Sequence, residues 1–171
     1  MPRGYEPRLN RVSSRWALIG IPAASVMLGS MTVLVPQISL YPILPPFGLL
    51  ILLAWRMIVR DLWPVWAALP LGLFDDIFSG QPMGSAMLLW TLVFLVLDIF
   101  DRWMMWRDYR QDWAIAGTLI AVVLFLSLAI ANNSGGAASP AVILPQVLVS
   151  ILMFPLMVRL CAWLDVLRWT L

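Results

Sequence analysis

The chain alternates long apolar segments with short polar ones. Apolar residues dominate six segments, which are residues 17–35, 43–59, 62–78, 83–100, 114–131 and 142–163. Each segment is close to the ~20 residues that an α-helix needs to cross the ~30 Å hydrocarbon core of a bilayer. The alternating segments of about ten residues that are typical of membrane β-barrels are absent from the sequence. The pattern predicts an all-α, polytopic membrane protein, with six transmembrane helices in one domain over residues 1–171.

Proline and glycine mark the ends of several predicted helices. Two prolines at 45–46 open the second segment, and the run Gly-Gln-Pro at 80–82 separates the third from the fourth. Residues 132–140 are small, uncharged and rich in turn formers, which indicates a short external loop before the sixth segment. Within that last segment, Pro145 and Pro155 are expected to interrupt the helix.

The N-terminal region is rich in arginine and resembles the n-region of a signal peptide. The apolar run at 17–35 is, however, longer than the 7–15 residues of a cleaved signal sequence, and it leads into Pro36 and Gln37 instead of a small-residue cleavage site. We therefore expect a retained first helix.

All basic residues of the chain are arginines, and they follow one side of the predicted topology. With the N-terminus inside, the inner segments hold Arg3, Arg8, Arg11, Arg15, Arg56, Arg60, Arg102, Arg107, Arg110, Arg159 and Arg168. The three outer loops hold none. The positive-inside rule then predicts that both termini are cytoplasmic.

A charged, tryptophan-rich segment follows the fourth apolar run. Trp103, Trp106, Arg110 and Trp113 recur at spacings of three and four residues, which places three indoles along one side of a helix. This pattern predicts an interfacial helix lying on the membrane. The alternative is that the fourth helix simply continues into the cytoplasm.

Composition supports the membrane assignment and excludes several kinds of chemistry. Apolar residues make up 62% of the chain and charged residues 12%, against about 25% charged in soluble domains. Histidine is absent and Cys161 is the only cysteine, so disulfides, His/Cys metal sites and Ser-His or Cys-His catalytic pairs are excluded. The net charge of +2 comes from arginines at segment ends, and it does not indicate nucleic-acid binding. We expect no cofactor and no metal.

The stretch 72–84 sets two adjacent carboxylates and several glycines inside this apolar sequence. On a continuous helix Gly72, Asp76 and Gly80 lie four residues apart on one face, and Gly84 continues the spacing. Small residues at this spacing allow helices to approach closely in a membrane. Asp76 would accept hydrogen bonds from a neighbouring helix or cap the helix that starts near Met83.

Asp75 points about 100° away from Asp76 on such a helix and is expected to reach the outer interface. A catalytic dyad is therefore disfavoured, because the two carboxylates diverge and because Asp98 and Asp101 belong to the opposite side of the membrane. The chain is not expected to be an enzyme.

A transport function would use Asp76 as a cation or proton site. Against it, the polar residues of the other segments are sparse and uncharged, namely Ser25, Thr32, Thr91, Ser127, Gln146 and Ser150.

The pattern Gly-Leu-x-x-Asp-x-x-x-Gly-x-x-x-Gly at 72–84 resembles the MreD family of bacterial rod-shape-determining membrane proteins. Pro45 before the apolar run 49–55 is similar to the family's proline-led second span, and the stretch 155–159 is similar to its C-terminal proline-to-arginine stretch. By position Asp76 corresponds to the family's aspartate. The chain departs from the family after Pro45, where an acidic residue is often expected and Pro46 and Phe47 follow instead.

The resemblance implies a non-enzymatic component of the bacterial inner membrane that takes part in cell elongation. Its implied partners are MreC, and indirectly the MreB cytoskeleton and a glycosyltransferase–transpeptidase pair that makes sidewall peptidoglycan. The family's bundle is similar to the substrate-binding subunits of energy-coupling-factor transporters. The residues singled out for packing or partner contact are Gly72, Asp76, Gly80, Gly84 and Pro45. The alternative function is a transport subunit, or a subunit that binds lipid or a small molecule, with a pocket at Asp76.

Overall fold

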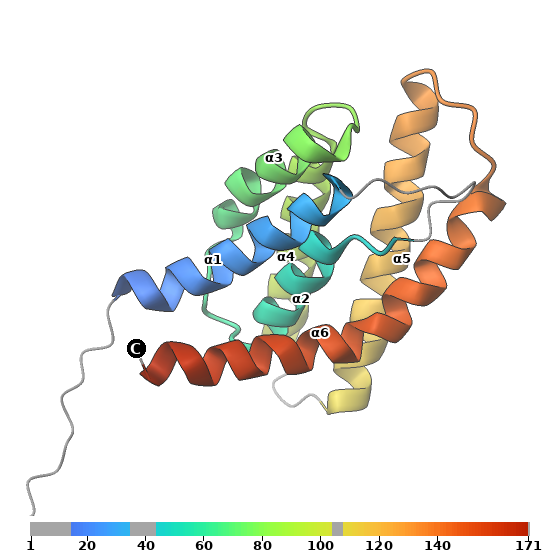
Figure 1. The fold of residues 1–171 in the computed structure, drawn as a ribbon. Helices are drawn as coiled ribbons and strands as arrows, with labels where there is room; N and C mark the ends of the chain where they lie inside the picture. Colours follow the sequence, from blue (N-terminus) through green and yellow to red (C-terminus); the bar gives the residue numbers. More distant parts are fainter. Residues whose placement is uncertain (1–14, 35–43, 104–107, 171) are drawn as a thin grey trace, which may run out of the picture.

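A computed structural model describes residues 15–34, 44–103 and 108–170 of the chain. Within these ranges the protein is all-α, with six α-helices, three short 3-10 helices and no strand (Figure 1). The α-helices are α1 (Arg15–Met31), α2 (Phe47–Ile58), α3 (Ala68–Ser79), α4 (Ser85–Trp103), α5 (Tyr109–Asn133) and α6 (Leu144–Thr170). The 3-10 helices are Thr32–Leu34, Val65–Ala67 and Pro140–Ile143. The predicted all-α class and the order of six helices are confirmed.

The helices differ in length far more than the apolar segments suggested. In the described residues two helical runs are long and apolar enough to cross a membrane, Tyr109–Asn133 and Pro140–Arg168. By contrast α2 and α3 have 12 residues each. At about 1.5 Å per residue each extends over only ~18 Å, so both are shorter than the predicted segments 43–59 and 62–78.

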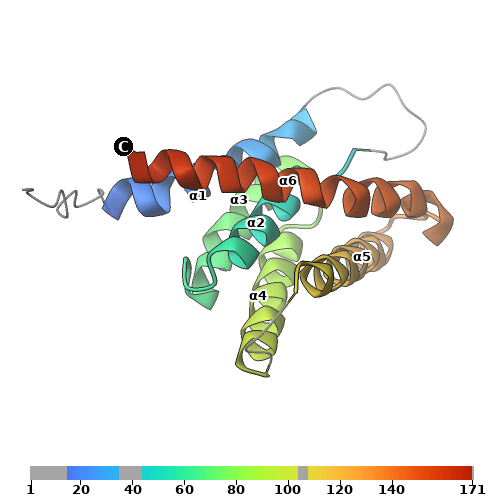
Figure 2. The same ribbon diagram turned by 90° about the horizontal axis from the view of Figure 1, so that it is seen from below.

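The short helix α2 forms the centre of the bundle. Its nine consecutive residues from Gly48 to Arg56 are all buried, which fits a helix that is apolar on every side. It packs mainly against α1 and α6, while α3 packs mainly against α4. Figure 2 shows α2 next to α6, near the middle of the molecule. Helix α5 and the first half of α6 extend away from this centre, whereas the second half of α6 lies beside α1 and α2 (Figure 2).

Charged side chains join the helices at one end of the bundle. The Arg56 guanidinium at the end of α2 lies 3.0 Å from Asp101 on α4. Near the end of α6, Arg168 lies over the Trp55 ring at 5.4 Å and donates a hydrogen bond to the Leu18 carbonyl at 3.1 Å. The α3–α4 turn and the α5–α6 loop lie together at the other end (Figure 1).

Two predictions about helix boundaries were wrong. Trp103 and Trp113 do not belong to one helix, because Trp103 is on α4 whereas Asp108 is extended and starts α5, which carries Trp113. Asp108 and Gln111 form a capping box that starts α5. Trp106 lies outside the described residues, as do the first three arginines and the loop 35–43. The other error concerns α6, which continues without a break through Pro155.

Candidate functional site

The stretch 72–84 forms a tightly packed junction between α3 and α4. Gly72 is buried on α3, and a Cβ atom placed on it would lie 2.6 Å from the Met87 Cα and 2.8 Å from the Ala86 carbonyl oxygen. Both of these are backbone atoms, which cannot move aside as a flexible side chain does. A residue without a side chain is therefore required here, as the small-residue interpretation of Gly72 predicted.

Asp76 lies one turn further along α3 and is only 3% exposed. Its Oδ1 accepts hydrogen bonds from the Ser85 hydroxyl at 3.0 Å and the Ala86 N–H at 2.8 Å. Its Oδ2 accepts from the Gly84 N–H at 3.0 Å and the Met87 N–H at 3.2 Å. The carboxylate therefore holds the first turn of α4 through four hydrogen bonds.

This arrangement is a helix cap supplied by another helix. The first N–H groups of an α-helix have no partner within the helix, and the helix N-terminus carries a partial positive charge that favours an anion. Asp76 satisfies both needs for α4, which begins at Ser85. Of the roles predicted for Asp76, hydrogen bonding to the neighbouring helix as its cap is the one observed.

Gly80 and Gly84 have a different role from the one their spacing suggested. Gly80 ends α3 in the left-handed conformation with φ +66°, and Gly84 precedes α4 with φ +94°. A Cβ atom on either residue would meet nothing within 4 Å. The prediction that they extend the packing face of Gly72 and Asp76 is wrong. They allow the chain to turn between α3 and α4, because glycine adopts a positive φ at little cost. This turn places the start of α4 against the Asp76 carboxylate.

Asp75 diverges from Asp76, as predicted, and it is partly buried among other helices. It turns toward α1 and α2, where its carboxylate interacts with the Ser30 hydroxyl. A Cβ atom on Gly48 would lie 3.1 Å from the Asp75 Oδ1. The missing side chain of Gly48 thus leaves space for the carboxylate between the two helices.

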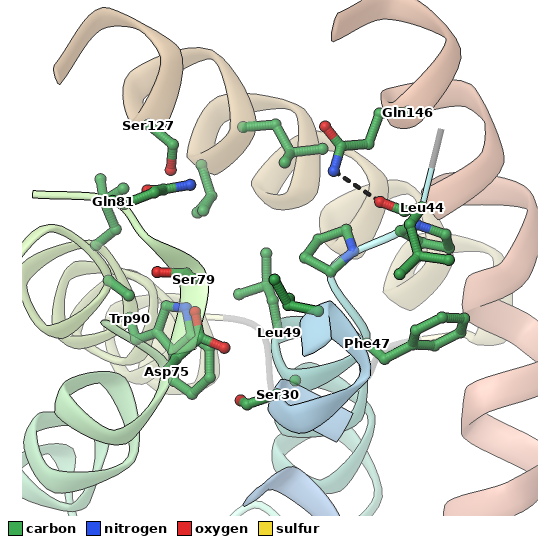
Figure 3. Close-up of a pocket in the computed structure, with 18 of the residues that line it drawn as sticks. Ser30, Leu44, Phe47, Leu49, Asp75, Ser79, Gln81, Trp90, Ser127 and Gln146 are labelled. Carbon is green, nitrogen blue, oxygen red and sulfur yellow. Dashed lines mark hydrogen bonds between the residues drawn. The ribbon is translucent and has the colours of Figure 1, made fainter. Parts of the chain in front are cut away.

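Beside the junction lies a cavity of about 360 Å³. Its lining comes from the C-terminal parts of α1, α3 and α5 and from the starts of α2, α4 and α6. In Figure 3 the polar side chains form an arc along one side, made up of Ser127, Gln81, Ser79, Asp75 and Ser30. Gln146 lies across the cavity and donates a hydrogen bond to the Leu44 carbonyl at 2.8 Å.

Sequence reasoning missed most of this cavity. Pro45, singled out at the start of the second segment, is buried and lines the cavity. Ser127 and Gln146 were noted only as isolated polar residues, whereas the fold brings them together with Asp75. The sequence around Ser30 did not indicate that this residue lines a cavity. The useful signal was the direction of Asp75, which helix geometry placed on a different face from Asp76.

The geometry limits what the two aspartates can do. Asp76 has both oxygens engaged by α4 and does not line the cavity, so the pocket expected at Asp76 lies at Asp75 instead. Asp98 and Asp101 contact Arg56 at the far end of the bundle. Within the described ranges no group of three metal-ligating side chains is clustered.

Comparisons of the chain with protein-family models, with curated proteins and with solved structures gave no match. Function is therefore inferred from the site and from the resemblance of residues 72–84 to the MreD motif.

Proposed function

We propose that the protein is a non-enzymatic scaffold of the bacterial inner membrane that resembles MreD and binds MreC. Through MreC it would support the MreB cytoskeleton and the synthase pair that makes sidewall peptidoglycan. The observation that carries this proposal is the α3–α4 junction. The resemblance mainly rests on Gly72 and Asp76, which hold α3 and α4 together. Both carboxylate oxygens of Asp76 accept hydrogen bonds from α4, so neither is free for chemistry.

In this proposal all six helices lie in the membrane, with both termini in the cytoplasm, in a bundle similar to energy-coupling-factor binding subunits. Two long apolar helical runs support the placement. Arg56 and Arg168 cluster at one end of the bundle, while the loop 133–140 at the other end is uncharged, as the positive-inside rule requires. A reporter fused after Gly136 should therefore score as periplasmic. A cytoplasmic score would contradict this topology.

The partner is expected to bind away from the glycine–aspartate motif, because Gly72 and Asp76 are already used inside the bundle. We assign the MreC transmembrane helix to an apolar groove of about 710 Å³ along α5, to which α6 contributes Ile151. Four small residues form one side of it, namely Ala114, Gly117, Thr118 and Ala121. Trp113 contributes to the lining and donates a hydrogen bond to the Ile151 carbonyl at 3.2 Å.

Small residues favour helix docking in a bilayer. Lipid chains are as apolar as leucine, so helices associate there through close packing and hydrogen bonds, which small residues permit. Gly117 is buried, and a Cβ atom on it would meet the Ile151 side chain at 3.5 Å, so the part of the groove that is open to another helix is formed by the exposed residues Ala114 and Thr118. The exposed face of α6 differs, because it presents large leucines such as Leu148, Leu152 and Leu156, which suit contact with lipid.

Filling the groove from its exposed side tests this assignment, because Ala114 and Thr118 line it and are both exposed. Ala114→Leu and Thr118→Leu should abolish co-purification of MreC and increase cell width, at normal abundance of the variant protein. Ala129→Leu is the matched control, since Ala129 is exposed on the same helix and does not line the groove. If both groove variants retain MreC, the groove holds lipid and the assignment is wrong. If the unmodified chain fails to co-purify with MreC, the proposed function itself is wrong.

The cavity favours a second candidate function, a membrane subunit that binds or transports a lipid or a small molecule. Its volume of about 360 Å³ falls in the range of ~300–1,000 Å³ that is usual for ligand pockets. A ligand that stays bound on purification, in a protein that does not bind MreC, would favour this function over the scaffold.

A further inference from the structure

The cavity beside Asp75 contains polar groups whose hydrogen bonding the described residues leave incomplete. The Ser79 hydroxyl oxygen is buried and has no hydrogen-bond partner among the described residues. The Ser30 hydroxyl oxygen is also buried, and it interacts with the Asp75 carboxylate without forming a hydrogen bond of full geometry. Ser30 is only 1% exposed. Buried hydroxyls normally find a partner, so two that lack a hydrogen bond of full geometry on the wall of one cavity indicate a missing hydrogen-bonding molecule.

The charge of the lining residues narrows the chemical class of molecule that the cavity can bind. Asp75 is the only ionisable residue among those that line the cavity in the described part of the chain. No arginine lines it there, and the sequence contains no lysine. Asp76 is adjacent in sequence but is held by the α4 backbone. A carboxylate without a basic partner in a largely apolar cavity attracts a cation that can also donate hydrogen bonds.

The walls of the cavity indicate an organic cation instead of a metal ion. Leu49, Leu89 and Trp90 line it and are each about 2% exposed. A metal ion would need several oxygen ligands, whereas Asp75 is the one carboxylate present. An ammonium group on a compact apolar body matches both the carboxylate and these walls, and tryptophan also favours cations near its ring.

We propose that this cavity binds a primary ammonium group. Its N–H donors bond to the Asp75 carboxylate and to the hydroxyl oxygens of Ser30 and Ser79, and the carbon atoms next to it lie against Leu49 and Trp90. Two sources present this chemistry, a free small amine and the ethanolamine headgroup of phosphatidylethanolamine. Binding does not depend on MreC, so it can fail or succeed separately from the scaffold function.

The first experiment measures a free amine by calorimetry on the full chain in dodecyl maltoside. The buffer is phosphate, because Tris is itself a primary amine. The probe is n-butylamine, and n-butanol is the neutral probe of similar shape. The unmodified protein should bind the amine and not the alcohol, and Asp75→Asn should weaken binding at least tenfold, since a charge-assisted hydrogen bond is lost. Asp61→Asn is the control, because Asp61 is an exposed carboxylate outside the cavity.

The second experiment tests the lipid source by native mass spectrometry after incubation with equal amounts of phosphatidylethanolamine and phosphatidylglycerol. Preferential retention of phosphatidylethanolamine that is lost in Asp75→Asn identifies the headgroup as the ligand. Binding of butylamine without such lipid preference identifies a free amine.

Ser79→Leu provides a second variant that places an apolar side chain in the cavity, and it should abolish binding in either experiment. Folding of each variant is checked with a thiol-reactive dye, because Cys161 is the only cysteine and is fully buried. The proposal is overturned if neither n-butylamine nor phosphatidylethanolamine binds the folded protein. It is also overturned if folded Asp75→Asn and Ser79→Leu bind these ligands as the unmodified chain does.

Discussion

Asp75 and Asp76 are adjacent in the sequence, yet they belong to two regions built in opposite ways. At the α3–α4 junction the Asp76 carboxylate accepts four hydrogen bonds, and Gly72 brings two backbones into contact. At the cavity, Asp75 borders about 360 Å³ of open space and lies beside the buried Ser30 and Ser79 hydroxyls, which make no hydrogen bond of full geometry to the described residues. One helix turn therefore carries an aspartate that serves the fold and an aspartate that is available to a ligand.

The difference shows that an acidic residue in an apolar helix does not by itself indicate chemistry. Burial of a carboxylate is costly unless hydrogen bonds replace its water. Four donors at the start of α4 supply that replacement for Asp76. Asp75 has the Ser30 hydroxyl beside it and no backbone cap among the described residues, so its carboxylate is the one that can still bind a ligand.

The largest effect is expected from Gly72→Ala. The new Cβ would collide with the α4 backbone at 2.6 Å, so the helices must separate, and we expect a loss of about 3 kcal/mol in the free energy of unfolding. Gly117→Ala is the matched control, because its Cβ would make an ordinary contact at 3.5 Å. Unfolding in mixed dodecyl maltoside and SDS micelles, followed by dye labelling of Cys161, measures both. Equal stability of the two variants would contradict the packed junction.

The next prediction compares the two aspartates directly. Asp76→Asn replaces one acceptor oxygen by an amide that faces backbone donors, and we expect a loss of about 2 kcal/mol in the same assay. Asp76→Ala should cost more, since it removes all four hydrogen bonds. Asp75→Asn should change stability by less than about 0.5 kcal/mol. A loss in Asp75→Asn as large as that in Asp76→Asn would show that the two regions are not distinct.

Gly80→Ala tests the turn that places α4 beneath Asp76. Gly80 has φ +66°, where an L-residue is strained, so we expect a loss of about 1 kcal/mol. Gly20 lies in helix α1, and like Gly80 it has nothing within 4 Å of a Cβ atom. Gly20→Ala should therefore be neutral or stabilising by up to about 1 kcal/mol. Matching effects of the two substitutions would show that backbone conformation is not what requires glycine at position 80.

The smallest effects come from a matched pair of serines. Ser85→Ala removes a buried hydrogen bond of 3.0 Å to Asp76 and should cost up to about 1 kcal/mol. Ser79→Ala removes a hydroxyl with no partner and should leave stability unchanged within about 0.5 kcal/mol. A larger loss from Ser79→Ala, in the absence of any amine, would indicate that its hydroxyl already has a structural partner.

The sequence alone determined the all-α class of the protein and the order of its helices. Apolar runs of helical length, broken at Pro45 and Pro46 and again at residues 80–82, predicted six helices, and six are observed in the described residues. The close approach at Gly72 and the hydrogen-bonding role of Asp76 were also within reach. Each depends on helix periodicity and on capping, which are properties of short stretches of chain.

Only the tertiary structure decided which helix is central, what Asp75 faces, and where the open surfaces lie. The apolar pattern of α2 does not distinguish contact with lipid from burial among other helices, since both environments favour the same residues. Ser30 and Gln146 are separated by more than a hundred residues, and they meet on one cavity because α1 and α6 pack around α2. Local sequence dictates which way a side chain leaves its helix, whereas the packing of distant helices dictates what it meets there.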